Sequence, residues 1–352
     1  MPVKFLKRGL LLMAVAVFLF GAVSCGDKDE SAKKAEEQKT EGTADTEREI
    51  TIGISKIVSH PALDGVEKGI QDQLKEMGYE NVTYDFQNAQ GDPSTAKQIA
   101  VKFKADKVDL AVGIATPTSQ ALASTLDQIP IIFSAVTDPV GAGLVPSLKE
   151  GGKNITGFSD MTPVAEQLKL LTKITEVKKL GHVYSSSEAN AVTLAGLAKE
   201  VCGEMGIEFV EATVTNSAEV KQATQSIVGR VDAIYVSTDN TVVSAFNSLT
   251  EVTMENGIPV MSADPSSAKS YNVMAALGFD YYKHGRATGR LIARILEGEN
   301  PKTVPTQFMN DPSDVDQLLI NLDVANELGI TIPKEVKDRA NMIIENGELT
   351  EL

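Results

Sequence analysis

The chain has 352 residues, of which 42% are hydrophobic, so it can bury two ordinary cores. Its formal net charge is -15, which argues against nucleic acid as a partner because nucleic acids favour basic surfaces. Aromatic residues make up only 5% and tryptophan is absent, so a pocket that sandwiches a sugar or base ring between aromatic side chains is poorly supplied.

Residues 1–25 have the layout of a secretory signal. They begin with basic residues, continue with an apolar core from Leu10 to Phe20, and end with small residues before Cys25. The core is too short for a membrane-spanning helix. The stretch AVSC resembles a loosened bacterial lipobox, which predicts cleavage before a lipid-modified Cys25; an ordinary cleaved signal peptide is the alternative. We therefore expect an exported protein anchored by acyl chains to a bacterial membrane, on its periplasmic or cell-surface side.

Residues 26–48 carry charges of both signs and no large apolar residue. Such a segment cannot bury a core, so it predicts a flexible tether, and folding is expected to begin at residue 49. The only other cysteine, Cys202, lies in a helical pattern and has no partner once Cys25 carries lipid. No internal disulfide is therefore expected.

Two strand-to-helix turns share one design. Residues 108–124, VDLAVGIATPTSQALAS, contain a short apolar run, a polar turn and the start of a helical pattern. Residues 231–240, VDAIYVSTDN, contain the same apolar run and polar turn. One small polar residue suffices to cap a helix, so the surplus of hydrogen-bonding side chains at each turn suggests a binding role.

The similarity extends beyond the turns. Residues 75–116 run parallel to residues 203–240, and each stretch is followed by a helical pattern and then by IPIIFSAVTDP or IPVMSADP. Repeats of this length indicate duplicated domains and not a solenoid. Alternating strands and helices predict an α/β fold of two doubly wound, parallel-sheet lobes. Because right-handed crossovers place the strand-to-helix turns at one edge of each sheet, we expect a ligand cleft between the lobes.

Patterns typical of catalysis are missing from the sequence. His60, His182 and His284 lie far apart without metal-ligand spacing, so each is expected to be a surface or hydrogen-bonded residue. No Gly-x-Ser-x-Gly elbow is present. The GAG at 141–143 lacks the third glycine and the acidic residue of a dinucleotide-binding motif. We therefore expect no enzymatic activity, no metal and no cofactor.

Four stretches in order carry a family resemblance: ATPTSQALA, IIFSAVTDPVGAGLV, NITGFSD and STDNTV. With the export signal and the two lobes, they make residues 49–335 resemble the substrate-binding lipoproteins of ABC transporters, in the family that includes tryptophan- and tyrosine-binding proteins. The resemblance implies the type I periplasmic binding protein fold, in which two lobes joined by three crossovers close on a small molecule for a membrane permease. It also implies an amino acid ligand, with tryptophan, tyrosine or phenylalanine favoured, and we expect a monomer.

Type I lobes are interleaved in sequence, so each lobe is expected to comprise two segments. Lobe 1 is placed at 49–159 plus 282–308, and lobe 2 at 160–281 plus 309–352. The crossovers are then expected near Ser159–Asp160, Phe279–Asp280 and Met309–Asn310. Hinge closure about these segments is the expected motion.

An amino acid ligand brings a carboxylate that needs hydrogen-bond donors. A helix amino terminus with hydroxyl side chains suits this group, which favours Thr116, Thr118 and Ser119 as ligand contacts. For Thr116 the alternative is an ordinary N-cap with Pro117 in the first turn.

The ammonium group of such a ligand needs carboxylates. Asp239 and Asp160 are the best-placed ones, and Asn240 suits either end of the ligand. Ligand contact is favoured for Asp239 because Ser237 or Thr238 is available to cap the helix that follows. Asp160 is equally suited to holding a crossover segment in place.

Other strand-end turns supply further candidates for the rim or the side-chain pocket, namely Thr137, Ser187, Glu188 and Asn190. Asp138 and Asp264 each precede a proline, so helix capping is favoured for both over ligand contact. Tyr281 and Tyr282 are placed either to stack on a ligand ring or to pack between the lobes.

Three alternatives to amino acid transport remain open. A sugar or nucleoside is the second choice of ligand. A ligand sensor for a membrane receptor would use the same cleft and the same lobe closure. A hydrolase of exported substrates is the third alternative, although nothing in the sequence indicates one.

Overall fold

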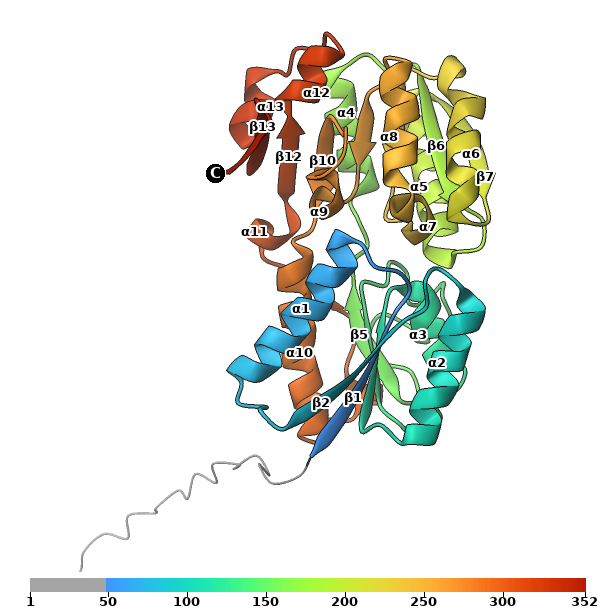
Figure 1. The fold of residues 1–352 in the computed structure, drawn as a ribbon, viewed down its shortest axis with the longest axis vertical. Helices are drawn as coiled ribbons and strands as arrows, with labels where there is room; N and C mark the ends of the chain where they lie inside the picture. Colours follow the sequence, from blue (N-terminus) through green and yellow to red (C-terminus); the bar gives the residue numbers. More distant parts are fainter. Residues whose placement is uncertain (1–48) are drawn as a thin grey trace, which may run out of the picture. The chain divides into compact units, whose positions relative to one another are not determined.

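The computed structural model describes residues 49–352 (Figure 1). The predicted signal peptide, Cys25 and the tether lie outside the described residues. Within the described part of the chain, no helix has the length and apolar character needed to cross a membrane.

The first sheet has six strands in the order β11-β5-β4-β3-β1-β2, all paired in parallel. Its central strands are buried along their whole length, as expected for a parallel sheet covered on both faces. The strands are β1 (Ile50–Lys56), β2 (Val82–Asn88), β3 (Leu110–Ile114), β4 (Ile131–Ser134), β5 (Ile155–Ser159) and β11 (Gln307–Phe308). Its helices are α1 (Pro61–Glu76), α2 (Pro93–Asp106), α3 (Thr116–Ala123), α10 (Tyr281–Leu296) and the short η3 (Pro301–Thr303).

Helices α1 and α10 lie side by side although they are far apart in sequence (Figure 1). Two glycines allow their close approach. A methyl group at Gly69 would lie 2.2 Å from the carbonyl oxygen of Tyr282, and one at Gly285 would lie 2.2 Å from that of Val66. This packing fixes where both helices begin, which matters because each begins beside the candidate site.

The second sheet has eight strands in the order β14-β13-β12-β10-β9-β8-β6-β7. The strands from β7 to β10 are paired in parallel, whereas β12 is antiparallel to β10 and β14 is antiparallel to β13. The α/β fold class is confirmed, with a reversed edge in this sheet that the sequence reading did not include. The strands are β6 (Lys179–Ser185), β7 (Glu208–Val214), β8 (Ala233–Val236), β9 (Val260–Ser262), β10 (Ala275–Gly278), β12 (Gln317–Asn321), β13 (Met342–Glu345) and β14 (Glu348–Glu351).

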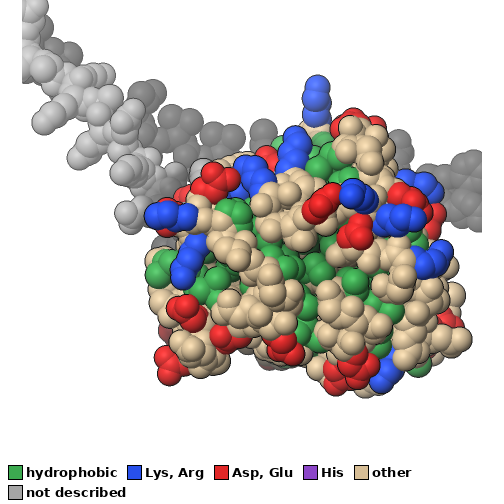
Figure 2. Space-filling model, turned by 90° about the horizontal axis from the view of Figure 1, so that it is seen from above, with side chains coloured by type: hydrophobic (Ala, Val, Ile, Leu, Met, Phe, Trp, Pro, Cys, Tyr) green, Lys and Arg blue, Asp and Glu red, His purple; other side chains and the backbone are tan. Residues whose placement is uncertain are grey.

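Helices cover this sheet as well, and two clusters of buried apolar side chains pack against it. His182 belongs to this core: its Nδ1 lies 2.8 Å from the carbonyl oxygen of Tyr235, and its ring stacks on that of Tyr235. Figure 2 shows acidic and basic side chains interspersed on the surface seen from above. The helices are α4 (Val164–Ile174), α5 (Ala189–Met205), η1 (Ser217–Glu219), α6 (Val220–Ile227), η2 (Val228–Arg230), α7 (Asn240–Ser244), α8 (Phe246–Glu255), α9 (Pro265–Ala268), α11 (Pro312–Val315), α12 (Leu322–Glu327) and α13 (Lys334–Arg339).

The chain passes between the two sheets three times. It enters the second sheet after β5, returns to the first after β10, and crosses again after β11. Phe279 and Tyr281, which our lobe boundaries place in lobe 2, pack in the core of the first sheet. Tyr281 begins α10 immediately after the second crossing, its ring lies beside that of His284, and the ring of Phe279 packs edge-on against that of Tyr281.

Candidate functional site

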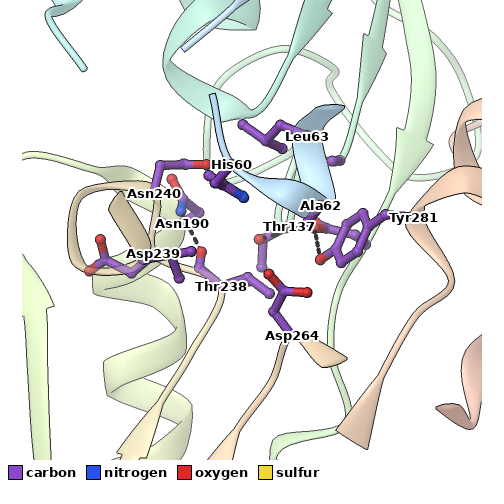
Figure 3. Close-up of a pocket in the computed structure, with 13 residues that line it drawn as sticks. His60, Ala62, Leu63, Thr137, Asn190, Thr238, Asp239, Asn240, Asp264 and Tyr281 are labelled. Carbon is purple, nitrogen blue, oxygen red and sulfur yellow. Dashed lines mark hydrogen bonds between the residues drawn. The ribbon is translucent and has the colours of Figure 1, made fainter. Parts of the chain in front are cut away.

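A pocket lies where strand-end turns of both sheets meet, and its atom-free space, counted together with space open to solvent, is about 340 Å³ (Figure 3). Its walls combine carboxylates, amides, hydroxyls and an imidazole with a few apolar side chains. They are His60, Ala62, Leu63, Ala135, Thr137, Asp160, Asn190, Thr238, Asp239, Asn240, Val243, Asp264 and Tyr281. This place, outside the carboxyl ends of parallel strands, is where α/β sheets bind ligands.

The structure brings five of the ten predicted ligand-binding residues to this pocket. They are Thr137, Asp160, Asn190, Asp239 and Asn240. The other five, Thr116, Thr118, Ser119, Ser187 and Glu188, do not line it, and they are used in other ways.

The hydroxyls of helix α3 bond to their own backbone. Thr118 donates to the carbonyl oxygen of Ile114 at 2.7 Å, and Ser119 donates to that of Gly113 at 3.0 Å. Both side chains are completely buried, so they hold α3 against β3. The alternative of Thr116 as an N-cap is wrong: the capping position is Ala115, and the buried Thr116 hydroxyl has no partner among the described residues.

Asp160 is held at the pocket by two hydroxyls. Tyr281 donates to one carboxylate oxygen at 2.9 Å and Thr137 to the other at 3.3 Å. Burial raises the pKa of Asp160 to about 6, and the hydrogen bonds from Tyr281 and Thr137 act against that rise. Tyr282, in contrast, donates to Asp72 at 3.0 Å and lies away from this pocket.

Asp239 caps helix α7 itself. One carboxylate oxygen accepts from the amide N–H of Val242 at 3.0 Å and the other from that of Ser185 at 2.6 Å. The expectation that Ser237 or Thr238 caps this helix is therefore wrong, and both hydroxyls are buried without a partner among the described residues. Burial, and then the charge of Glu188, raise the pKa of Asp239 to about 8. In Figure 3 its carboxylate points away from the centre of the pocket.

Asp264 combines capping with a place in the pocket wall. It accepts from the N–H groups of Ser266 at 2.9 Å and Ser267 at 3.2 Å, which confirms the predicted cap of α9. Its carboxylate points into the pocket, a position that the sequence reading did not favour (Figure 3). Asp138, also expected to cap a helix, instead closes a turn by accepting from the N–H of Gly141 at 2.9 Å.

Glu188 and Ser187 lie behind the pocket wall. Glu188 accepts from the Asn240 amide at 2.5 Å and from the N–H and hydroxyl of Thr241 at 2.9 and 2.7 Å. The hydroxyls of Ser187 and Ser185 are 2.9 Å apart. These residues therefore support the residues that face the pocket.

His60 is a pocket residue that the sequence reading missed. Both ring nitrogens are buried and have no hydrogen-bond partner among the described residues. Burial lowers the pKa of His60, against the effects of the Asp264 carboxylate and the Asn240 amide. The sequence does contain a pattern that indicates this position: His60 lies between a buried strand and a helix, as the polar residues of the predicted turns do.

His284 lies behind Ala135 and Tyr281, which line the pocket. Its Nε2 accepts from the N–H of Ala135 at 3.1 Å, so the ring is neutral there, and burial lowers its pKa to about 4. Ala135 has a φ of 54°, an uncommon value for a residue with a side chain. The hydrogen bond from its N–H helps to hold this turn, which presents the Ala135 methyl group to the pocket.

A model of the ABC transporter substrate binding protein family matches residues 51–344. The chain belongs to this family. Members of the family bind solutes outside the cytoplasm and are not enzymes. The tyrosine-binding protein of Clostridioides difficile (strain R20291) is 37% identical to this binding protein over 322 residues, which cover 90% of this chain and 91% of that protein.

The solved structures that are similar to this binding protein include the following two. An ABC domain from Streptococcus pneumonia in complex with L-Trp is 36% identical, with a TM-score of 0.81 and coverage of 84% of this chain and 100% of that one. The ligand-free, open structure of a substrate-binding protein with adhesive properties from Clostridium difficile is 37% identical, with a TM-score of 0.61 and coverage of 81% and 96%. At nearly equal identity, the structure is thus closer to the L-Trp complex than to the ligand-free, open protein.

Proposed function

We propose that this binding protein is a lipid-anchored component of an ABC importer that captures an aromatic amino acid by closure of its two lobes. The pocket is the observation that carries this proposal. Asp160 and Asp264 line it, the carboxylate of Asp239 points away from its centre, and no lysine or arginine is among its described lining residues. Such a wall suits a ligand with a cationic group.

The remaining walls suit an apolar side chain. Ala62, Leu63, Ala135 and Val243 supply apolar surface, and a small number of polar groups among apolar walls is typical of small-molecule sites. The aromatic character of the ligand is supported by the relatives: one is named a tyrosine-binding protein, and another was solved with L-Trp. The anchor is supported by the signal-like start that ends at Cys25.

A thermal-shift panel of amino acids, sugars and nucleosides tests the ligand class. A ligand that binds only the native state stabilises it by about 2.7 kcal/mol at a hundredfold excess over Kd. We expect tyrosine, tryptophan or phenylalanine to raise the melting temperature most. A strong shift with a sugar or nucleoside and none with an amino acid would contradict the ligand assignment, and measurable conversion of the ligand would contradict transport as well.

A further inference from the structure

Two asparagine side chains on the second-lobe wall are oriented by their neighbours. The amide nitrogen of Asn190 donates to the carbonyl oxygen of Thr238 at 2.9 Å and approaches Glu188 at 3.4 Å. Asn190 is only 3% exposed, and its amide oxygen has no partner among the described residues. In Figure 3 its nitrogen points toward Thr238, so its oxygen lies on the opposite side of the amide.

Asn240 is oriented in the same sense. Its amide nitrogen donates to Glu188 at 2.5 Å, which leaves its oxygen directed away from Glu188. In Figure 3 the side chain of Asn240 lies beside His60 at the pocket.

Glu188 orients Asn240. It also contributes to the orientation of Asn190, whose shorter bond is to Thr238. Glu188 is 5% exposed, and its second oxygen accepts from the N–H and hydroxyl of Thr241. A carboxylate only accepts hydrogen bonds, so amides beside it turn their nitrogens toward it. Both asparagines therefore present acceptors, not donors, on the pocket side.

We propose that the second-lobe wall binds the protonated amine of the ligand through the amide oxygens of Asn190 and Asn240 together with Asp264, and that Glu188 is the positioning residue for this cradle. The inference rests on the proposed function and extends it. A protonated amine suits these acceptors, whereas a ligand carboxylate meets only neutral donors, because no lysine or arginine is among the described residues that line the pocket. The inference thus assigns the main polar recognition of the ligand to its protonated amine and not to its carboxylate.

Ligands that lack one charged group at a time test this assignment by calorimetry. The tyrosine series comprises L-tyrosine, tyramine and 3-(4-hydroxyphenyl)propionate, and the tryptophan series comprises L-tryptophan, tryptamine and indole-3-propionate. We expect the deaminated acid to bind about a hundredfold more weakly than the amino acid, because it leaves buried acceptors unpaired. The amine should keep the larger share of the affinity. A deaminated acid that binds as tightly as the amine would overturn the proposal.

The variant Glu188→Gln tests the positioning role. Glutamine offers one acceptor and one donor. Its oxygen keeps the bonds from Thr241, so its NH2 group faces Asn240, whose amide rotates and presents its own NH2 group to the pocket. The preference for amine over acid should fall about tenfold, a change that simple loss of stability would not produce. An unchanged preference would show that Glu188 does not position the cradle.

Glu219→Gln is the matched control. Glu219 also accepts from the N–H and hydroxyl of a threonine, Thr215, at 2.6 and 3.1 Å, but it is exposed and lies outside the pocket. This variant should keep the wild-type preference. The two proposals can fail separately. If an amine binds but no amino acid does, the proposed function is contradicted and the amine site is supported. If the amino acid and the deaminated acid bind equally well, the proposed function is supported and the amine site is contradicted.

Discussion

The phenol of Tyr281 donates a hydrogen bond of 2.9 Å to the carboxylate of Asp160. Asp160 follows β5 and Tyr281 begins α10, so this bond joins two of the three places where the chain passes between the sheets. Asp160 is 3% exposed, and burial raises its pKa from the usual 3.8 to about 6. The bond therefore combines a structural link beside the pocket with a group that titrates in a mildly acidic range.

Asp160→Asn should weaken the pH dependence of stability between about pH 4 and pH 6. Because the folded-state pKa is raised, the contribution of Asp160 to stability is fully present below its unfolded pKa and is lost as the pH rises through the folded pKa. Two pKa units correspond to a loss of about 3 kcal/mol. Asparagine does not titrate and still offers an oxygen to Tyr281. Urea unfolding across this range, compared between variant and wild type, measures the difference.

Asp72→Asn is the control for this experiment. Asp72 also accepts from a tyrosine hydroxyl, that of Tyr282 at 3.0 Å, but its pair is exposed. The Lys68 ammonium group lowers the pKa of Asp72, which is the opposite direction to the shift of Asp160. The control should follow the wild-type slope. If Asp160→Asn follows it too, the titration of Asp160 does not contribute to stability.

Asp239→Asn should weaken the loss of ligand-free stability between about pH 4 and pH 8, because burial and the charge of Glu188 raise the pKa of Asp239 to about 8 and asparagine does not titrate. Each carboxylate oxygen of Asp239 accepts from a different backbone N–H, and Asp239 is 1% exposed. Asparagine supplies a single oxygen, and one buried N–H left unpaired costs about 1–3 kcal/mol. This cost offsets part of the gain, and a shallower decline of the ligand-free melting temperature from about pH 4 to pH 8 than in the wild type is the expected result. Asp92→Asn should change little, because Asp92 caps α2 through one oxygen only.

The fold class and the positions of the polar turns could be predicted from the sequence, but the direction in which each side chain points could not. Thr118 and Thr137 both follow buried strands, yet the hydroxyl of Thr118 bonds to the backbone of its own turn whereas that of Thr137 reaches Asp160. Spacing along the chain does not distinguish these outcomes, since they depend on which segment packs opposite. His60 was missed for another reason: it was considered only as a metal ligand or base, although its position after a strand matches that of the other turns.

Cys25→Ser should leave the protein folded but release it from the membrane. The predicted acyl chains on Cys25 are the expected source of membrane attachment. Fractionation of cells that express each form, followed by detection of the protein in the soluble and membrane fractions, measures the change. The anchor is disproved by a wild-type protein in the soluble fraction or by a variant that stays with the membrane.

Gly285→Ala should weaken both folding and ligand binding, because it pushes α10 away from α1. The added methyl group would lie 2.2 Å from the backbone oxygen of Val66, and no rotamer change relieves a clash with backbone. Overpacking of this kind costs about 1–3 kcal/mol. The displacement also reaches the pocket, since α1 begins beside His60 and α10 begins at Tyr281.

Gly196→Ala in α5 is the matched control. Its added methyl group would have no atom within 4 Å, so the higher helix propensity of alanine alone should stabilise this variant by about 0.5–1 kcal/mol. Both variants gain the helix propensity of alanine, but only Gly285→Ala introduces the clash. Comparing their melting temperatures and calorimetric affinities therefore measures the effect of the clash. Equal stabilisation by the two substitutions would show that α1 and α10 separate without cost.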